Sequence, residues 1–412
     1  MSEFYKKVRD RLIRYAKVDT QSMNGSEQVP STAKQFDLAR ILRDELIEIG
    51  AADVRLDEKH CVVYGKVPGN TAGGRKLGLV AHLDTAPGVS GTCVKPWVLP
   101  DYQGQDIVLN KEKSIVMRAG DFPSLKDYIG QDLILTDGTT LLGGDDKASI
   151  AAIMTMAEYL LAHPEKKHGD IAIAFTPDEE VGGLAKDLDL ERFGSPTAYT
   201  MDGEHLGYYE VETFNASSAK ISIAGRSVHP GTAKGIMVNS VDIGAEFLSL
   251  LPAYEKPQYT DGREGFFHVT SISGTCEHTE IELIVRDHDS VQFAVREEYL
   301  RKVTEGLNRK YGKETVILEI HEQYRSMKEV VEKVPCLVDH LVQAIRDCGV
   351  EPRKIAFRGG TDGSALSHRG LPCPNLSAGY ENAHGRFEYV PIQSMEKNVE
   401  ILLRLAEIYS EG

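Results

Sequence analysis

Hydrophobic residues in the first half of the chain follow two alternating patterns. Short apolar runs rich in β-branched residues predict buried strands at residues 61–67, 77–81, 133–135, 171–175 and 197–201. Apolar residues at helical spacing predict a helix over residues 33–49, which Gly50 ends, and residues 147–162, between two of these strands, indicate a buried helix. Strands separated by helices are typical of an α/β layer with a largely parallel sheet.

The pattern changes after residue 207. The predicted elements are then strands at 208–224, 266–274, 279–286 and 315–320 and helices at 237–251 and 290–311. Their order, β-α-β-β-α-β, is ferredoxin-like. Helices over 328–348 and 392–410 and a strand over 354–357 then resume the first pattern. We therefore expect an α/β fold in which a discontinuous domain (1–207 and 325–412), with a mixed, largely parallel sheet flanked by helices, is interrupted by a smaller ferredoxin-like domain (208–324).

Composition and charge limit the binding partners and the cellular location that we expect for the protein. The 412 residues carry a formal net charge of -15, which disfavours binding to nucleic acid or to an anionic membrane. The N-terminus lacks the apolar segment of a secretory signal, and no apolar run approaches the roughly 18 residues of a membrane span. The six cysteines form no CxxC pair, so we expect reduced thiols and a cytoplasmic protein.

Acidic and histidine residues gather where predicted strands end. They are His82 and Asp84, Glu179 and Glu180, Asp202, Asp145 at the start of a helix, and His384 in a glycine-rich loop. Taken singly, the acids fit helix caps or solvated loops, and a lone histidine is more often structural than a ligand. Ligands of open α/β sheets bind beyond the carboxyl ends of the strands, so these groups are expected to converge there. Carboxylates and imidazoles together are the ligand set of a hydrolytic metal site.

Several short motifs strengthen this interpretation. They are HLDT at 82–85, LGGDDK at 142–147, PDEE at 177–180, DG at 202–203 and the loop around His384. Together they resemble the metal-binding motifs of the M20 metallopeptidases. The resemblance runs from about residue 10 to residue 405, and it is closest to members that act as tripeptide aminopeptidases. Further agreeing stretches are residues 18–22, 136–141, 227–235, 358–363 and 370–375.

The resemblance implies two divalent metal ions per subunit, with zinc as the first choice. Asp145 would bridge the ions, His82 and Asp202 would complete one site, and Glu180 and His384 would complete the other.

It also implies roles for the two acids beside these ligands. Asp84 would orient the His82 imidazole, and Glu179 would be the general base for a water whose pKa the two cations lower.

The resemblance gives the residues 208–324 the role of a lid and dimer interface. His229 would reach the active site of the partner subunit and stabilise the oxyanion, and Arg286 would bind the substrate carboxylate. Asn239, Arg358 and Thr361 are weaker candidates for holding the peptide backbone. Without the resemblance, His229 fits a turn residue before Pro230, and Arg286 fits a surface ion pair.

The function implied is that of a homodimeric two-metal aminopeptidase that hydrolyses the N-terminal bond of tripeptides. The alternatives are another M20-type hydrolase (a dipeptidase, a carboxypeptidase or an N-acyl-amino-acid hydrolase) and a catalytically silent peptide-binding protein. A serine hydrolase or a phosphate-binding enzyme is disfavoured, because the chain has no GxSxG, GxxxxGK[ST] or GxGxxG motif.

Three residues depart from the family pattern. Gly144 and Ser149 replace an alanine and a glycine, and we expect little effect from either change. Glu204 stands where a second glycine is usual. Its carboxylate could attract the α-ammonium group of a peptide, alter metal affinity or point into solvent.

Overall fold

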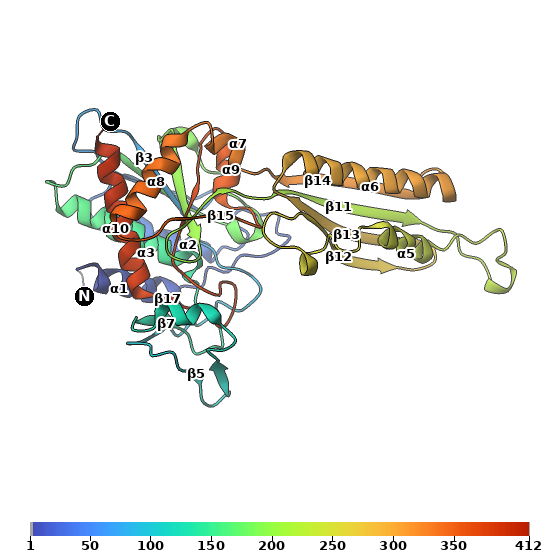
Figure 1. The fold of residues 1–412 in the computed structure, drawn as a ribbon, viewed down its shortest axis with the longest axis horizontal. Coiled ribbons are helices and arrows are strands. Elements are labelled where there is room, and N and C mark those ends of the chain that lie inside the picture. The colour runs from blue at the N-terminus through green and yellow to red at the C-terminus, as the bar shows by residue number, and fades with distance from the viewer. Residues whose placement is uncertain (1–2, 412) are drawn as a thin grey trace. The chain divides into compact units, whose positions relative to one another are not determined.

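The computed structural model describes residues 3–411, which fall into two compact units (Figure 1). The first unit comprises Met1–Val211, Met327–Ile355 and Thr361–Gly412, and the second comprises Glu212–Ser326 and Ala356–Gly360. The pattern of the sequence did not assign residues 356–360 to the second unit. They belong there because the returning chain pairs with its start: Phe357 N donates to Glu212 O at 2.9 Å, and Phe214 N donates to Gly359 O at 3.1 Å.

An eight-stranded mixed sheet forms the centre of the first unit, in the order β1-β2-β8-β3-β9-β16-β10-β15. Its strands are β1 (Ala52–Asp57), β2 (Val62–Val67), β3 (Leu77–His82), β8 (Ile171–Thr176), β9 (Ala198–Gly203), β10 (Tyr208–Glu212), β15 (Arg353–Ala356) and β16 (Asn375–Ser377). Strands β8, β3, β9 and β16 pair parallel to one another, whereas β1 with β2, β2 with β8 and β10 with β16 pair antiparallel. Strands β3 and β8 are buried at every position, as their continuous apolar sequences predict.

Helices cover both faces of this sheet, which confirms the predicted α/β class. Alternate residues of β2 enter different cores: Val63 and Val67 pack on one side, and Val62 and Tyr64 on the other. The first side is covered by α1 (Phe4–Ala16), α2 (Gln35–Glu48), α3 (Gly144–Ala162), α8 (Pro335–Asp347) and α10 (Ile392–Ser410). The second side carries α4 (Leu190–Phe193) and α9 (Asp362–His368).

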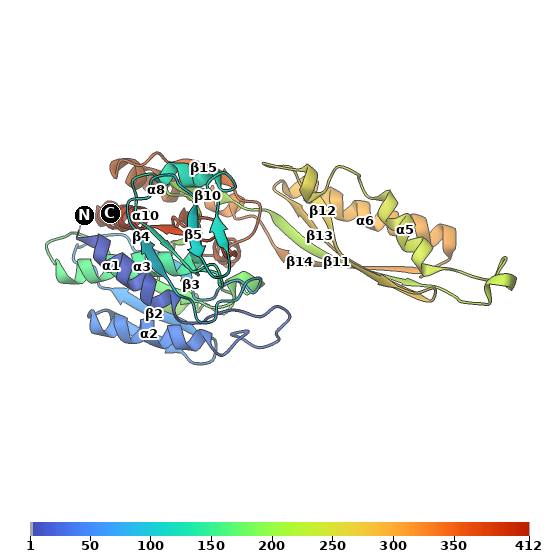
Figure 2. The ribbon, with the colours of Figure 1, turned by 90° about the horizontal axis from the view of Figure 1, so that it is seen from below.

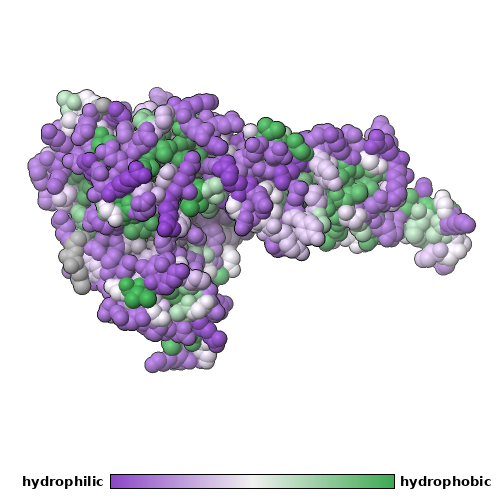
Figure 3. All heavy atoms as spheres, in the orientation of Figure 1, coloured by the Kyte–Doolittle hydropathy of each residue, from purple (hydrophilic) through white to green (hydrophobic). Residues whose placement is uncertain are grey.

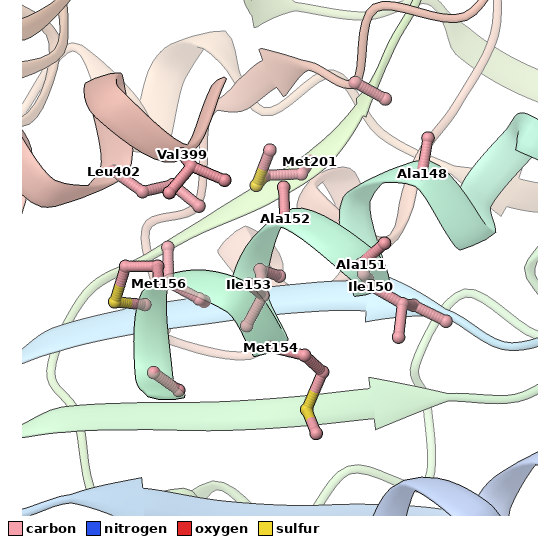
Figure 4. Close-up of a cluster of buried hydrophobic side chains, with 14 of the residues drawn as sticks. Ala148, Ile150, Ala151, Ala152, Ile153, Met154, Met156, Met201, Val399 and Leu402 are labelled. Atoms are coloured by element: carbon pink, nitrogen blue, oxygen red, sulfur yellow. The ribbon is translucent and has the colours of Figure 1, made fainter. Parts of the chain in front are cut away.

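Helix α3 is the most deeply buried helix of the first unit. It packs against α1, α10 and β3, and Figure 4 shows Ala152 beside Met201 while Ile150 and Met154 point to the opposite side of the helix. Apolar residues surround the whole circumference of the helix, as expected for a core helix. Each large aliphatic side chain buried there contributes roughly 1.5–3 kcal/mol to stability, and this packing holds the N-terminal end of α3 in place.

A second, smaller sheet corrects one prediction. The strand β7 (Leu133–Leu135) does not join the main sheet; it pairs antiparallel with β4 (Trp97–Leu99) and β17 (Val390–Pro391). The hairpin β5 (Ile107–Asn110) and β6 (Ile115–Met117) and the short helix η1 (Pro123–Tyr128) lie in the same region of the chain. Because β7 precedes the turn into α3 and β17 follows the loop of His384, their pairing brings these two distant segments together.

The second unit is a four-stranded antiparallel sheet in the order β12-β13-β11-β14. Its elements are β11 (Asn215–Ala224), α5 (Ser240–Leu250), β12 (Phe266–Gly274), β13 (His278–Asp287), α6 (Ser290–Tyr311) and β14 (Val316–Tyr324). This is the predicted β-α-β-β-α-β order, and both helices pack on one face of the sheet (Figure 2). On the other face, Ile317 is about half exposed.

Two predicted elements are divided in the structure. The strand expected over 208–224 is split into β10 and β11, which belong to different sheets. The helix expected over 328–348 is split into α7 (Lys328–Val331) and α8, because Pro335 starts a new helix.

Hydrophilic side chains cover most of the surface seen in Figure 3, with hydrophobic patches between them. Within residues 3–411, no helix is both long enough and apolar enough to cross a membrane.

Candidate metal centre

The candidate ligands come from five separate segments of the first unit. His82 ends β3, Asp202 lies near the end of β9, and Glu180 lies in the short helix η2 (Glu179–Val181) that follows β8. These three strands are neighbours and parallel, so their carboxyl ends meet at one edge of the sheet. Asp145 lies in the first turn of α3, and His384 lies in the loop before β17.

Asp145 lies between the two histidines. Its Oδ1 is 2.9 Å from His82 Nε2, and its Oδ2 is 3.0 Å from His384 Nε2. Each histidine also faces a second acid: His82 Nε2 is 3.5 Å from Asp202 Oδ1, and His384 Nε2 is 2.9 Å from Glu180 Oε2. The five predicted ligands therefore form two groups that share Asp145.

The donor set fits divalent metal ions. Ligand atoms of His82, Asp145 and Glu180 lie within 4.8 Å of one another, and so do those of His82, Glu179 and Asp202. Glu180 Oε1 is buried and has no hydrogen-bond partner in the described chain, so it is available to a cation. Carboxylate and imidazole ligands of this kind suit zinc, manganese or cobalt.

Asp84 connects the ligands on β3 with the loop after β8. It is fully buried, and its two carboxylate oxygens accept the backbone N–H groups of Glu179 at 3.0 Å and Glu180 at 3.2 Å. His82 Nδ1 lies 3.1 Å from Asp84 O and 3.4 Å from Asp84 Oδ1. Such acceptors hold the proton on Nδ1 and turn Nε2 towards the metal position, in agreement with the role expected for Asp84.

Three further residues support the ligands, and our sequence analysis did not identify them as such. Asp146 Oδ2 accepts the His82 N–H at 3.1 Å. The Tyr380 hydroxyl donates to Asp202 Oδ1 at 3.2 Å. Glu388 accepts the backbone N–H groups of Leu142, Gly143 and Asp145. Of the three, only Asp146 lies within a motif of the sequence, LGGDDK at 142–147. Tyr380 and Glu388 belong to no motif and have no regular spacing from the ligands that would indicate their role.

The electrostatics of the cluster favour a bound cation. Burial and the charge of Asp145 raise the pKa of Glu180 to about 7. Hydrogen bonds to Asp145 and Glu180 raise the pKa of His384 to about 11. Burial would raise the pKa of Asp145, but the hydrogen bonds from His384 and His82 lower it below the usual value. A divalent cation would relieve the repulsion among these carboxylates.

Glu179 differs from its neighbour in its surroundings. Burial and the charge of Asp202 raise the pKa of Glu179 well above the usual value. A carboxylate with a raised pKa binds a proton more readily than an ordinary glutamate does, which suits a general base. This environment is consistent with the general base expected at Glu179.

The residues predicted to bind substrate from the inserted domain lie in the second unit. His229 is exposed, and its Nδ1 accepts the N–H of Gly231 at 3.1 Å, so the proton of the neutral ring lies on Nε2. Arg286 is partly buried on β13, where Nη1 donates to Ser217 O at 3.1 Å and the guanidinium lies over the Tyr324 ring. Among the described residues, Arg286 forms no ion pair, so its charge is available to an anion.

The weaker candidates already have structural partners. Asn239 caps α5 through its side-chain oxygen and donates its side-chain N–H to Asp242. Arg358, in the second unit, donates to Gly262 O at 3.1 Å and Glu264 O at 2.9 Å. Thr361, in the first unit, is buried at the start of α9. These contacts give each residue a function in the fold.

The three departures from the family pattern have distinct surroundings. A Cβ atom on Gly144 would lie 2.5 Å from Val390 Cγ2 and 3.1 Å from Glu388 Oε1, so glycine fits closely here. Ser149 is buried on α3. Burial and the charges of Glu381 and Asp145 raise the pKa of Glu204, so its carboxyl lies within the electrostatic field of the metal cluster.

The model of peptidase family M20/M25/M40 matches residues 142–408. Two curated relatives named peptidase T, from Caldanaerobacter subterraneus subsp. tengcongensis and Clostridium novyi, are 47% and 48% identical; each match covers 98% of this chain and 99% of the relative.

Solved structures share the fold. An aminopeptidase PepT from Bacillus cereus has a TM-score of 0.78 at 20% identity, with 99% of each chain covered. A dinuclear metal-binding peptidase of family M20 from Bacillus subtilis has a TM-score of 0.66 at 14% identity, with 99% of each chain covered. The family match and the nearly full-length relatives together show that this chain belongs to peptidase family M20/M25/M40.

Proposed function

We propose that this protein is an aminopeptidase that removes the N-terminal residue from tripeptides with the help of two divalent metal ions. The observation that carries the proposal is the position of Asp145 between two histidine–acid pairs, with the carboxyl of Glu179 beside them. The relatives named peptidase T, at 47–48% identity over nearly the whole chain, support this choice within the family.

The ions would be held by the two groups that share Asp145, and zinc is the first candidate. His82 and Asp202 would complete one site, and Glu180 and His384 the other. When bound, such ions polarise the scissile carbonyl and lower the pKa of water.

Glu179 would act as the general base and then as the general acid. Its carboxylate takes a proton from the water that attacks the scissile carbonyl carbon. When the peptide C–N bond breaks, Glu179 passes that proton to the nitrogen of the departing dipeptide. The products are one free amino acid and one dipeptide, and Glu179 returns to its starting state.

His229 would supply a hydrogen bond to the oxygen of that carbonyl as negative charge develops on it. Its Nε2–H is the free donor of the ring, because Nδ1 already accepts the Gly231 N–H. One such donor contributes about 10²–10³-fold to the rate.

We propose that His229 acts across a homodimer formed by the second unit. Val291, Val295 and Tyr299 repeat every four residues along α6 and are 67%, 56% and 37% exposed, which supports an interface there.

Arg286 would bind the carboxylate at the far end of the tripeptide. Replacing it with Gln should raise KM for a free tripeptide about 10- to 100-fold, since a charge-assisted hydrogen bond contributes about 1.5–3 kcal/mol. The same tripeptide with a C-terminal amide is the control, and its KM should change little. Equal losses on both substrates would contradict the role of Arg286 as a carboxylate ligand.

Substrate choice and metal dependence test the proposal together. The purified protein is incubated with a free tripeptide, its N-acetylated form, the matching dipeptide and a tetrapeptide, with and without a chelator, and the products are identified by mass spectrometry. We expect release of the N-terminal residue from the free tripeptide only, and loss of this activity with the chelator. A preference for the dipeptide or the acetylated peptide would favour another M20-type hydrolase. Absence of hydrolysis after addition of zinc, manganese or cobalt would favour a silent binding protein.

We place the protein in the cytosol. All six cysteines are free thiols, which suits a reducing compartment.

A further inference from the structure

We propose that Glu388 is a positioning residue that locks the bridging ligand Asp145 and the loop of His384 into one rigid unit. This inference rests on the proposed metal centre. Glu388 is only 2% exposed. Its Oε2 accepts the N–H groups of Leu142 and Gly143, each at 2.8 Å, and its Oε1 accepts the N–H of Asp145 at 3.0 Å. One carboxylate therefore holds three backbone donors of the turn that presents Asp145.

These donors have no alternative partners in the turn. They lie at or before the N-terminal end of α3, where backbone N–H groups lack acceptors within the helix. A buried N–H without an acceptor is costly, so the turn keeps this conformation only while the carboxylate is present. The packing is close as well, since a Cβ on Gly144 would already lie 3.1 Å from Glu388 Oε1.

Glu388 and His384 also belong to one closed loop. The backbone of the loop is closed by two hydrogen bonds between Glu381 and Tyr389, of 2.9 and 3.1 Å, and Glu388 directly precedes the closing residue. The next residue, Val390, pairs with Ile134 of β7. The same nine-residue loop therefore carries one metal ligand, His384, and the carboxylate that positions another, Asp145.

The consequence concerns both metal positions. Asp145 Oδ1 faces His82 and Oδ2 faces His384, so a small rotation of its backbone would move both oxygens. His82 is held separately, by Asp84 and by its place at the end of the buried strand β3. Loss of the Glu388 carboxylate should therefore displace Asp145 from both histidines while His82 stays in place. Changes in residues that orient metal ligands typically lower metal affinity by about 10–100-fold.

The test compares zinc binding by the wild-type protein and by Glu388→Gln, measured by competition with a chromophoric chelator. Glutamine keeps the size of the side chain but replaces one acceptor oxygen with an N–H₂ donor, which would face a backbone N–H. We expect about 10- to 100-fold weaker zinc binding. At saturating cobalt(II), we expect altered visible absorption bands, because the coordination geometry changes; a loss of stability alone would leave these bands unchanged.

The matched control is Glu45→Gln. Glu45 is also a buried carboxylate, and it accepts from Arg11 Nε at 2.8 Å and Tyr15 Oη at 2.6 Å, on helices that carry no ligand. This variant should lose stability but keep wild-type zinc affinity and cobalt bands. If Glu388→Gln matches the wild type in both measurements, the positioning role is wrong. If the wild type itself binds no zinc or cobalt, the proposed metal centre fails instead.

A measurement on the unmodified protein keeps the inference testable if Glu388→Gln does not fold. In metal-free wild-type protein, the amides of Leu142, Gly143 and Asp145 should be protected in hydrogen–deuterium exchange. Exchange at the rate of an open loop would overturn the inference.

Discussion

Replacing Glu179 with Gln is expected to lower kcat for tripeptide hydrolysis by about 10²–10⁴-fold, the usual contribution of a general base, while two metal ions remain bound. Glutamine cannot take the proton from water, but it occupies the same volume. KM should change little, because the residue acts on the reacting water and makes no contact that binds the peptide alone. Metal content is measured by atomic emission, and kcat by product release under saturating substrate.

The matched variant for this experiment is Glu180→Gln. The two acids are neighbours in η2 and their backbone N–H groups share the carboxylate of Asp84, yet only Glu180 lies 2.9 Å from His384 Nε2. We expect Glu180→Gln to lose one metal ion per subunit and Glu179→Gln to lose none. Glu179 also lies in a possible ligand group with His82 and Asp202. Loss of an ion in Glu179→Gln would therefore make Glu179 a ligand and exclude it as the general base.

Replacing Asp145 with Ala should remove both metal ions and abolish hydrolysis. Each of its oxygens faces a different histidine, so its removal takes a ligand from both sites. Metal content of the dialysed protein and turnover of a free tripeptide are the two measurements.

The control for Asp145→Ala is Asp202→Ala, which removes a ligand from one site only. It should keep about one ion per subunit, held by Asp145, Glu180 and His384. If Asp145→Ala keeps two ions, Asp145 is not the bridging ligand. If both variants keep one ion, the two sites do not share Asp145.

The sequence by itself determined the elements whose signal is local. The helix α3 follows from a long apolar segment, and α6, α10 and the order of elements in the second unit follow from apolar periodicity, with capping and breaking residues within a few positions. The candidate ligands could also be predicted, because His82, Glu180 and Asp202 lie at or just beyond the ends of largely apolar strands. Parallel neighbours bring such ends to one edge of a sheet, whatever the rest of the chain does.

Only the tertiary structure decided how those residues are held. Glu388 accepts an N–H from Asp145, which lies 243 positions earlier in the sequence. The strand β7 pairs with β17, after the loop of His384, and not with the main sheet. Residues 356–360 joined the second unit through hydrogen bonds with its first residues. Such contacts depend on which distant segments fold next to each other, and buried backbone N–H groups can donate to any carboxylate that fits. The positions around Glu388 therefore carry no periodicity or spacing that would reveal its partners.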